Sequence, residues 1–373
     1  MKPILLLGCG RQSYGAAVAL AKLGHSMILG DRESRVSGFL HFWLTDRGMG
    51  GSVVRSITME PGSAAYQEAI DECGGVLSCI PYTATAHVLR DAIERGINYV
   101  DLGCERADID SVQSVLPEGA PRATWIFDAG LAPGLLNQLG EGLIKDWPEA
   151  ESLQLFCGGL PVEPWGPFGY YPYFSPESVV AEYQDEAVVL RDGAVIRLPG
   201  LSNLEEIEIP GAGRFEAFLT SGGESDAPSR LSSKIRNFEY KTLRYPGHCA
   251  AMTLMRDAGM WSTEPLAEGE TPPLTTFLRL LAPVRGNVPH DRVIGMAKAT
   301  GAGESRAAYF VQESNYSLHI SAMSMMTGFP AAIVMDQLMK SPPDGLKSAG
   351  EWGCCDEMVE ALEGLGVNVK FKF

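Results

Sequence analysis

The sequence has little positive charge for its length. Its 373 residues include 30 Lys and Arg against 46 Asp and Glu, which gives a formal net charge of -16, and no run of Lys and Arg appears anywhere. Proteins that bind nucleic acid present basic stripes to the phosphate backbone. The composition therefore argues against a nucleic-acid partner and favours small-molecule ligands.

Long apolar runs are also missing. No stretch approaches the roughly 18 apolar residues of a membrane helix, and Gly8 and Gly10 interrupt the apolar start MKPILLLGCG too early for a signal peptide. The eight cysteines are scattered, without a regular framework or a pair of CxxC motifs. We therefore expect reduced thiols in a cytoplasmic protein, with no membrane partner and no metal site. GxSxG and Walker motifs are absent as well, which disfavours hydrolases and transferases.

From residue 3 to about residue 130, short apolar runs alternate with amphipathic segments. The apolar runs are typical of buried parallel strands, and the segments at 15–24 and 83–96 have helical spacing and end at glycine. This pattern predicts an α/β fold of the Rossmann type, with a doubly wound parallel sheet. The expected strands lie at residues 3–8, 26–31, 53–59, 75–81, 98–103 and 124–130.

The pattern changes after residue 135. Residues 151–325 are rich in Gly and Pro and contain stretches in which apolar and polar residues alternate, which predicts a second, α+β domain with a mixed or antiparallel sheet. Helical spacing returns near the end of the chain. We therefore expect domains at 1–135 and 136–325, and C-terminal helices at 326–373 that pack back on the first domain.

The stretch LLLGCGRQSYGAAVALAKLG begins as a strand, turns at Gly8 and Gly10 and continues as a helix. The N–H groups at the start of such a helix point at whatever lies over the turn, and a pyrophosphate is the natural occupant. Ser13 replaces the third glycine of the GxGxxG pattern but is small enough for helix and strand to stay close. The first domain is therefore expected to bind a dinucleotide at Gly8, Gly10 and Ser13.

Asp31 ends the second expected strand, 21 residues after Gly10. A carboxylate at this place accepts hydrogen bonds from the adenosine ribose and repels a 2′-phosphate, so NAD is the expected cofactor and NADP the less favoured one. Arg32, the next residue, weakens this preference for NAD over NADP. The loop after the fourth strand approaches the cofactor from the carboxyl edge of such a sheet. The cofactor neighbours expected there are Ser78, Ile80 and Pro81.

Four motifs follow one another along the chain. They are DAGLAPG at 128–134, CGGLP at 157–161, KTLRYPGH at 241–248 and TGFPAA at 327–332. With them the chain resembles the saccharopine dehydrogenase-like family over nearly its whole length, especially lysine 6-dehydrogenase and saccharopine reductase. The resemblance implies a Rossmann domain, a substrate domain, a homodimer, and hydride exchange between a nicotinamide and a nitrogen-bearing carbon of an amino acid or amine.

The resemblance also implies substrate-site residues. Saccharopine reductases use an aspartate, a cysteine and an arginine around the amino-acid substrate, at positions that match Asp128, Cys157 and Arg244. The family's usual GYK reads GYY here, so Tyr171 replaces a lysine, and the substrate is expected to be less anionic than saccharopine or differently shaped. Tyr171 belongs to an aromatic stretch at 163–174 that forms either a wall of the substrate pocket or a core or dimer-contact loop.

Arg244 lies in a stretch, YKTLRYPGH, that gathers cationic and hydrogen-bonding groups within an acidic chain. A guanidinium is a planar fork that can hold a carboxylate by two charge-assisted hydrogen bonds. We therefore expect Arg244, with Tyr245 beside it, to bind the carboxylate of an amino acid. The alternative is a structural ion pair between Arg244 and one of the chain's own acidic residues.

Amine oxidation needs a base, because the nitrogen must be neutral when hydride leaves the neighbouring carbon. Deprotonating an amine of pKa about 10.4 costs roughly 4 to 5 kcal/mol at pH 7. Asp128 is the first candidate. His248 is the second, because histidine titrates near neutrality. Lys241 is the third, provided that burial lowers its pKa. We expect Cys157 to line the pocket rather than act as a nucleophile, since hydride transfer needs no covalent intermediate.

These observations lead to three functional hypotheses. The first is an NAD-dependent oxidoreductase that acts on a C–N bond, with oxidative deamination by lysine 6-dehydrogenase as the nearest example. The second is reductive condensation of an aldehyde with an amino acid, as in saccharopine reductase or carboxynorspermidine synthase, because hydride transfer is reversible. The third is a non-catalytic NAD-binding sensor, which Ser13 and Tyr171 keep open as departures from the expected motifs.

Overall fold

The computed structural model describes residues 2–116, 119, 121–281, 288–353 and 355–372. The chain divides into two compact units. The first comprises Met1–Gly142, Asn315–Ile320 and Ser324–Val369, and the second Leu143–Ser314, Ser321–Met323 and Lys370–Phe373. The division after Gly142 falls inside a helix, α6, that begins at the boundary expected from the sequence. Among the described residues, no helix is both long and apolar enough to cross a membrane.

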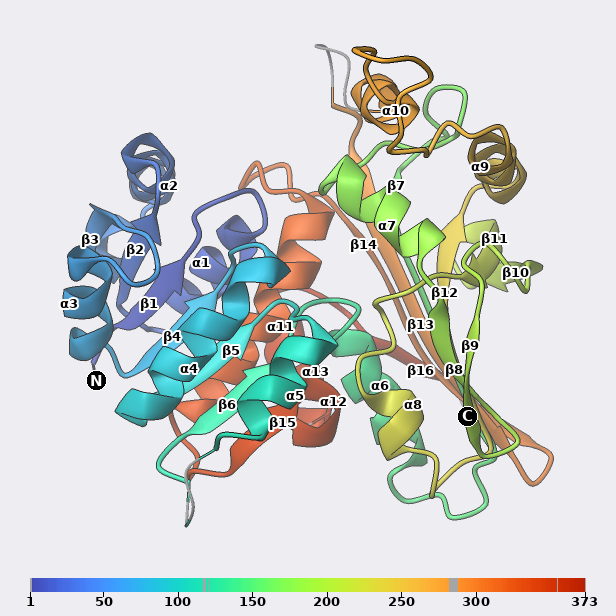
Figure 1. Cartoon of the computed structure of the whole chain (residues 1–373). Helices are drawn as coiled ribbons and strands as arrows, with labels where there is room; N and C mark the ends of the chain where they lie inside the picture. Colours follow the sequence, from blue (N-terminus) through green and yellow to red (C-terminus); the bar gives the residue numbers. More distant parts are fainter. Residues whose placement is uncertain (1, 117–118, 120, 282–287, 354, 373) are drawn as a thin grey trace. The chain divides into compact units, whose positions relative to one another are not determined.

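The first unit contains a sheet of seven parallel strands in the order β15-β6-β5-β4-β1-β2-β3 (Figure 1). Its strands are β1 (Ile4–Leu7), β2 (Met27–Asp31), β3 (Val53–Thr58), β4 (Gly75–Ser78), β5 (Asn98–Asp101), β6 (Thr124–Phe127) and β15 (Gly345–Ser348). The chain order reverses between β1 and β4, which is the switch point of a Rossmann-type sheet. The prediction of this fold is confirmed. The sequence patterns did not predict β15, which extends the sheet beside β6.

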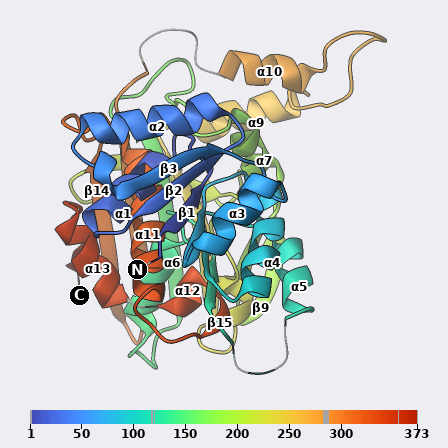
Figure 2. The same cartoon turned by 90° about the vertical axis from the view of Figure 1, so that its left-hand side faces the viewer.

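Helices cover both faces of this sheet. In Figures 1 and 2, α3, α4 and α5 lie on one face, and α1 and α11 lie on the other. The helices of this unit, with their 3-10 turns, are α1 (Ser13–Lys22), α2 (Ser34–Asp46), η1 (Gly50–Ser52), α3 (Ala64–Glu72), η2 (Tyr82–Ala84), α4 (Thr85–Arg95), α5 (Arg106–Gln113), α6 (Leu135–Ile144), α11 (Ala322–Leu338), α12 (Ala349–Trp352) and α13 (Cys355–Gly364). The apolar strands β1 and β4 are wholly buried between these layers.

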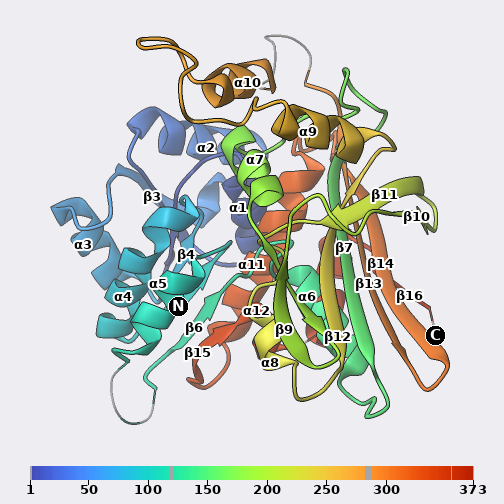
Figure 3. The same ribbon diagram turned by 45° about the vertical axis from the view of Figure 1, so that its right-hand side comes forward.

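The second unit is built on a mixed, nine-stranded sheet with the order β10-β11-β12-β7-β13-β14-β16, and β8 and β9 pair beside β12 (Figure 3). Its strands are β7 (Ser152–Pro161), β8 (Ala187–Arg191), β9 (Ala194–Leu198), β10 (Glu205–Ile209), β11 (Gly213–Leu219), β12 (Asn237–Arg244), β13 (Asp291–Gly301), β14 (Glu304–Glu313) and β16 (Lys370–Lys372). Among the described residues of this sheet, β12 and β7 run parallel and the other pairs are antiparallel. The predicted second, mixed-sheet domain is thus confirmed.

Four helices accompany this sheet: α7 (Pro176–Gln184), α8 (Ala227–Arg230), α9 (His248–Asp257) and α10 (Pro273–Leu281). Ser175 caps α7, because its hydroxyl accepts a hydrogen bond from the Ser178 N–H, and Pro176 supplies a first helical residue that needs no N–H partner. The inner side of α7 buries Val179, Val180 and Tyr183 in the apolar core of this unit. This packing brings the hydroxyl of Tyr183 to the end of β12.

Candidate functional site

The turn after β1 has the geometry that a dinucleotide-binding loop requires. Gly8 has φ +88°, and a Cβ there would lie 2.8 Å from the carbonyl atoms of Cys79, so only glycine fits. At Gly10 the situation is the opposite, since a Cβ would meet no atom within 4 Å. Space therefore remains over Gly10 beside the start of α1, where a phosphate can approach the backbone.

Ser13 does not take the packing role of the third glycine. Its hydroxyl donates a hydrogen bond to the Gly10 carbonyl at 2.7 Å and so stiffens the turn. The close contact occurs two residues later, where a Cβ at Gly15 would lie 1.9 Å from the Ser324 carbonyl oxygen on α11. The Ser324 hydroxyl also accepts a hydrogen bond from the Gly15 N–H at 3.0 Å and donates one to the Arg11 carbonyl at 2.8 Å. A helix from the end of the chain thus holds the glycine turn in place.

Gly15→Ala is expected to destabilise the first unit by about 3 kcal/mol or more, because the new methyl group meets backbone atoms that cannot move aside. Gly10→Ala is the matched control: its methyl group meets open space, so the thermal unfolding midpoint should stay near that of the wild type, while dinucleotide affinity falls. Differential scanning fluorimetry with and without NAD measures both effects. Equal midpoints for Gly15→Ala and the wild type would contradict the assigned contact.

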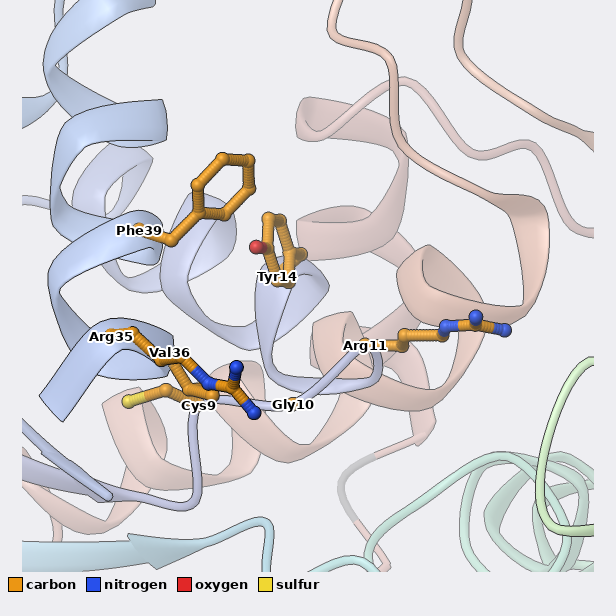
Figure 4. Close-up of a pocket in the computed structure, with 7 residues that line it drawn as sticks. All are labelled: Cys9, Gly10, Arg11, Tyr14, Arg35, Val36 and Phe39. Carbon is orange, nitrogen blue, oxygen red and sulfur yellow. The ribbon is translucent and has the colours of Figure 1, made fainter. Parts of the chain in front are cut away.

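A pocket of about 480 Å³ lies over the glycine turn (Figure 4). In the figure, the guanidinium of Arg35 reaches back toward Gly10, and the rings of Tyr14 and Phe39 stand above it. The lining residues are Cys9, Gly10, Arg11, Tyr14, Arg35, Val36 and Phe39. Of these, only Gly10 was expected from the sequence. Cys9 and Arg11 lie in the glycine turn itself, and the others come from α1 and α2 at positions that no motif marks. The glycine cradle, the open space and a cationic group together fit a dinucleotide.

Asp31 is fixed beside the turn. One carboxylate oxygen accepts a hydrogen bond from the Cys9 N–H at 2.8 Å, and the other accepts one from the Glu33 N–H at 2.9 Å. Arg32 is exposed. After β4, Ser78 is buried, Ile80 packs against the core of the first unit, and Pro81 is exposed. Asp31 therefore contacts the glycine turn at Cys9, and the backbone of Ile80 lies beside Gly8.

Two aspartates meet where β5 and β6 end. Asp128, 7% exposed and in the left-handed region at φ +59°, donates its N–H to an Asp101 carboxylate oxygen at 2.9 Å. Its own carboxylate accepts the Cys104 N–H at 3.1 Å. The other Asp101 oxygen accepts the Tyr99 hydroxyl at 3.0 Å. Burial, and then the neighbouring Asp128, raise the pKa of Asp101 to about 7. No sequence motif marked Asp101, although Asp101 ends the strand next to the one that precedes Asp128.

In the second unit, Arg244 ends β12 and is 3% exposed. Its Nε donates to the Tyr183 hydroxyl at 2.9 Å, and its Nη1 donates to the Leu243 carbonyl at 2.9 Å. The guanidinium carbon lies 4.3 Å from the centre of the Tyr170 ring. Within the part of the chain that the structure describes, no carboxylate forms an ion pair with Arg244. A buried guanidinium that makes no direct ion pair is uncommon in folded proteins.

His248 is part of the same network but is not the neutral-pH base that the sequence suggested. Its Nδ1 lies 2.9 Å from the Phe168 carbonyl, which can only accept, so Nδ1 carries the proton. Its Nε2 then accepts the Tyr183 hydroxyl at 3.0 Å. Burial, and then the charge of Arg244, lower the pKa of His248 to about 3. The expectation that His248 titrates near neutrality is therefore wrong, and its visible role is to orient Tyr183.

Lys241, unlike His248, is not part of the hydrogen-bond network of Arg244. Side chains alternate along a strand, so Lys241 lies on the face of β12 opposite Arg244. Its Nζ donates to Glu205 at 2.6 Å and lies 3.4 Å from Glu239. Both partners of the Lys241 ammonium are carboxylates of its own unit, and its contacts do not include Arg244. The ion pairs explain instead why a buried lysine is tolerated at this position.

A comparison with protein families places the chain. A family model described as "Saccharopine dehydrogenase C-terminal domain" matches residues 130–367, which is well over half of the chain. The chain belongs to the saccharopine dehydrogenase family. The resemblance noted from the four motifs is thus confirmed.

Two members of the saccharopine dehydrogenase family illustrate the likeness. The chain shares its fold with apo saccharopine dehydrogenase (L-Glu forming) from Saccharomyces cerevisiae, with a TM-score of 0.76, 18% identity, and coverage of 100% of this chain and 99% of that one. It is 27% identical over 150 residues to saccharopine dehydrogenase [NADP(+), L-glutamate-forming] from Schizosaccharomyces pombe. That match covers 38% of this chain and 32% of the relative, so this chain aligns with about a third of the relative's length.

The structure also defines the contacts of three further residues that were expected at the substrate site. Cys157 is buried, and burial raises its pKa to about 12, so it stays a thiol, as expected for a packing residue. Tyr171 is buried and packs on Tyr173 with ring centres 5.0 Å apart. The Tyr245 hydroxyl donates toward the carbonyls of Pro161 and Val162 and accepts from Arg292. These contacts engage the hydroxyl within the unit, and the ring packs beside Phe215, with ring centres 5.6 Å apart.

Proposed function

We propose that this protein is a nicotinamide-dependent oxidoreductase that acts on a C–N bond of an amino acid or amine. The observation that carries the proposal is Arg244, a buried guanidinium with no carboxylate partner among the described residues, in a chain whose first unit has a dinucleotide-type glycine turn. Nε and one N–H of Nη1 are used within the protein, and the remaining N–H groups, on Nη2 and Nη1, are left to hold a substrate carboxylate.

The glycine turn and Asp31 hold the cofactor, and Arg244 holds the substrate. When bound, the nicotinamide supplies the hydride chemistry. Asp128 accepts the proton of the substrate ammonium, because the nitrogen must be neutral before its lone pair can assist loss of hydride from the neighbouring carbon. Asp128 is favoured over His248, whose pKa is lowered to about 3, and over the ion-paired Lys241.

Oxidative deamination and reductive condensation remain the two candidate directions. The relatives are named L-glutamate-forming saccharopine dehydrogenases, which describes oxidative cleavage that releases an amino acid; reductive condensation is the reverse of that reaction at the same C–N bond. Tyr171, which stands where those enzymes are expected to have a lysine, supports a different substrate. The test is incubation with NAD and a panel of amines and amino acids, and with NADH, an aldehyde and an amino acid, while nicotinamide absorbance is followed. NAD binding without turnover in either assay would support the sensor hypothesis instead.

We further propose NAD as the cofactor, although the curated relative is named for NADP(+). Asp31→Asn is expected to raise the NADP-to-NAD ratio of kcat/KM by tenfold or more, because it removes a negative charge from the place of a 2′-phosphate. Asn keeps one side-chain oxygen that can accept a backbone N–H. Glu72→Gln is the matched control, since Glu72 is an exposed carboxylate on α3 that is paired with Arg55 and does not line the pocket. An unchanged ratio in Asp31→Asn would remove Asp31 from cofactor selection.

A further inference from the structure

The carboxylate of Asp101 is wholly buried at the end of β5. It accepts hydrogen bonds from the Tyr99 hydroxyl at 3.0 Å and from the Asp128 N–H at 2.9 Å. Within the described residues, no Lys, Arg or His forms an ion pair with it. A buried carboxylate that is held only by neutral donors is costly. An amide would fill the same space at lower cost, so packing does not explain why a carboxylate stands there.

Asp101 and the loop after it hold the turn that carries Asp128. The main-chain carbonyl of Asp101 accepts the Ala129 N–H at 2.9 Å, and its side chain accepts the N–H of Asp128. From the same loop, the Cys104 N–H donates to the Asp128 carboxylate at 3.1 Å. The backbone of Asp128 lies in the left-handed region, which a non-glycine residue adopts where its surroundings hold it there. The direction of the Asp128 carboxylate thus depends on contacts from residues 101–104.

The two carboxylates also influence each other's charge. The hydrogen bond from the Asp128 N–H brings the Asp101 carboxylate against the residue that carries the second carboxylate. Burial, and then Asp128, raise the pKa of Asp101 to about 7. The repulsion is mutual, so an ionised Asp101 strengthens the hold of Asp128 on a proton. A stronger base is better matched to a substrate ammonium, because a proton moves more readily to an acceptor whose pKa is closer to that of the donor.

The other titratable groups around Asp101 stay neutral near pH 7. They are Tyr99 on β5, Cys79 after β4 and Cys104 in the loop after β5. Burial raises the pKa of each of them, to about 12 for Cys104. In the described parts of the chain, no cationic side chain contributes to the pKa of Asp101. Asp101 is therefore the group among these four whose charge changes near neutral pH.

We propose that Asp101 is the positioning residue for the proton acceptor of this site: its carboxylate fixes the orientation of Asp128 through the turn, and its negative charge makes Asp128 the stronger base. The proton is then accepted by a coupled pair of carboxylates. Asp101 acts through Asp128 and need not touch the substrate. This inference rests on the proposed function, in which Asp128 takes the proton of the ammonium, and it assigns a residue and a pH dependence beyond it.

Turnover of the full chain between pH 6 and pH 9 tests this assignment with Asp101→Asn. Asparagine has the same shape, and its amide oxygen can still accept the Asp128 N–H. Wild-type turnover at pH 6 is expected to be about a tenth of that at pH 8, because Asp101 gains a proton near pH 7. Asp101→Asn should turn over about tenfold or more slowly at pH 8, with KM within about twofold of the wild type, and should lack the inflection near pH 7. A merely structural role would lower turnover equally at every pH and keep the inflection.

Tyr99→Phe gives a graded form of the test. It removes the hydroxyl that donates to Asp101 and keeps both carboxylates. Because that hydrogen bond lowers the pKa of Asp101, its loss should move the inflection to higher pH, while turnover at pH 9 stays near the wild-type value. Asp71→Asn, an exposed change on α3, is the matched control and should leave the profile as it is. An inflection that stays near pH 7 in Asp101→Asn overturns the assignment.

Thermal unfolding as a function of pH needs neither cofactor nor turnover. The pKa of Asp101 is about 7 in the folded chain and about 3.9 for an unfolded aspartate, so the stability that its protonated form contributes is lost as the pH rises through this window. The unfolding midpoint of Asp101→Asn should therefore rise relative to that of the wild type between pH 5 and pH 8. The rise should be smaller when both chains also carry Asp128→Asn, because Asp101 then loses its proton at lower pH.

The two measurements separate this inference from the proposed activity. A stability difference that varies with pH and depends on Asp128, together with no turnover of any amine or amino acid, keeps the coupled pair and removes the oxidoreductase proposal. Turnover with the wild-type pH profile in Asp101→Asn does the reverse. A stability difference that is the same at every pH also removes the coupled pair.

Discussion

Arg244→Met is expected to raise the KM for a carboxylate-bearing substrate by a factor of about 30 to several thousand, which corresponds to the roughly 2 to 5 kcal/mol lost when one partner of a buried charge pair is removed. Methionine fills a similar volume, and replacing a buried charge by an apolar side chain is often tolerated by the fold. The Tyr183 hydroxyl loses one donor but keeps His248 as a partner. Steady-state kinetics with an amino acid and with the amine that lacks its carboxylate measure the effect.

The control variant for this experiment is Arg256→Met, which removes an exposed guanidinium on α9 that is paired with its neighbour Asp257. It should leave KM unchanged. NAD affinity should also stay at the wild-type value in Arg244→Met, because the glycine turn belongs to the other unit. If the KM values of the amino acid and of the decarboxylated amine rise by the same factor, Arg244 does not bind the carboxylate.

The sequence predicted the first unit better than the second for a physical reason. Its strands are short, buried on both faces and separated by helices, so each appears as an apolar run. The glycine turn is local, and its conformation follows from residues that are neighbours in the chain. β15 was missed because residues 345–348 are half-buried and become a strand only by pairing with β6, more than two hundred residues away.

The residues around Arg244 show which features cannot be predicted from patterns in a single sequence. Arg244 was found because a motif marks it, but Tyr183 lies about sixty residues away on α7, and only the packing of that helix brings it to the end of β12. The buried histidine was misjudged because its pKa is set by a carbonyl, a hydroxyl and a guanidinium that the sequence does not place together. The separation of Lys241 from Arg244, in contrast, follows from alternation along one strand and was available in the sequence.

Asp128→Asn is expected to lower turnover by about 100- to 10,000-fold while substrate affinity changes little, because it removes a proton acceptor and keeps the shape of the side chain. Position 128 has φ +59°, a conformation that asparagine adopts as readily as aspartate, and the amide oxygen can still accept the Cys104 N–H. The fold of the turn should therefore survive. Circular dichroism and calorimetric binding of the substrate check that it does.

The pH dependence separates a base from a structural residue. In the wild type, Asp128 takes the proton, so turnover should vary little between pH 8 and pH 9, a range above the Asp101 pKa of about 7. In Asp128→Asn the amine must lose its proton to water. Turnover should then rise about tenfold per pH unit toward the amine pKa of about 10.4. Asp110→Asn, an exposed change on α5, should keep the wild-type profile. Parallel profiles for Asp128→Asn and the wild type would mean that another group accepts the proton, and Asp128 would then be only a part of the turn.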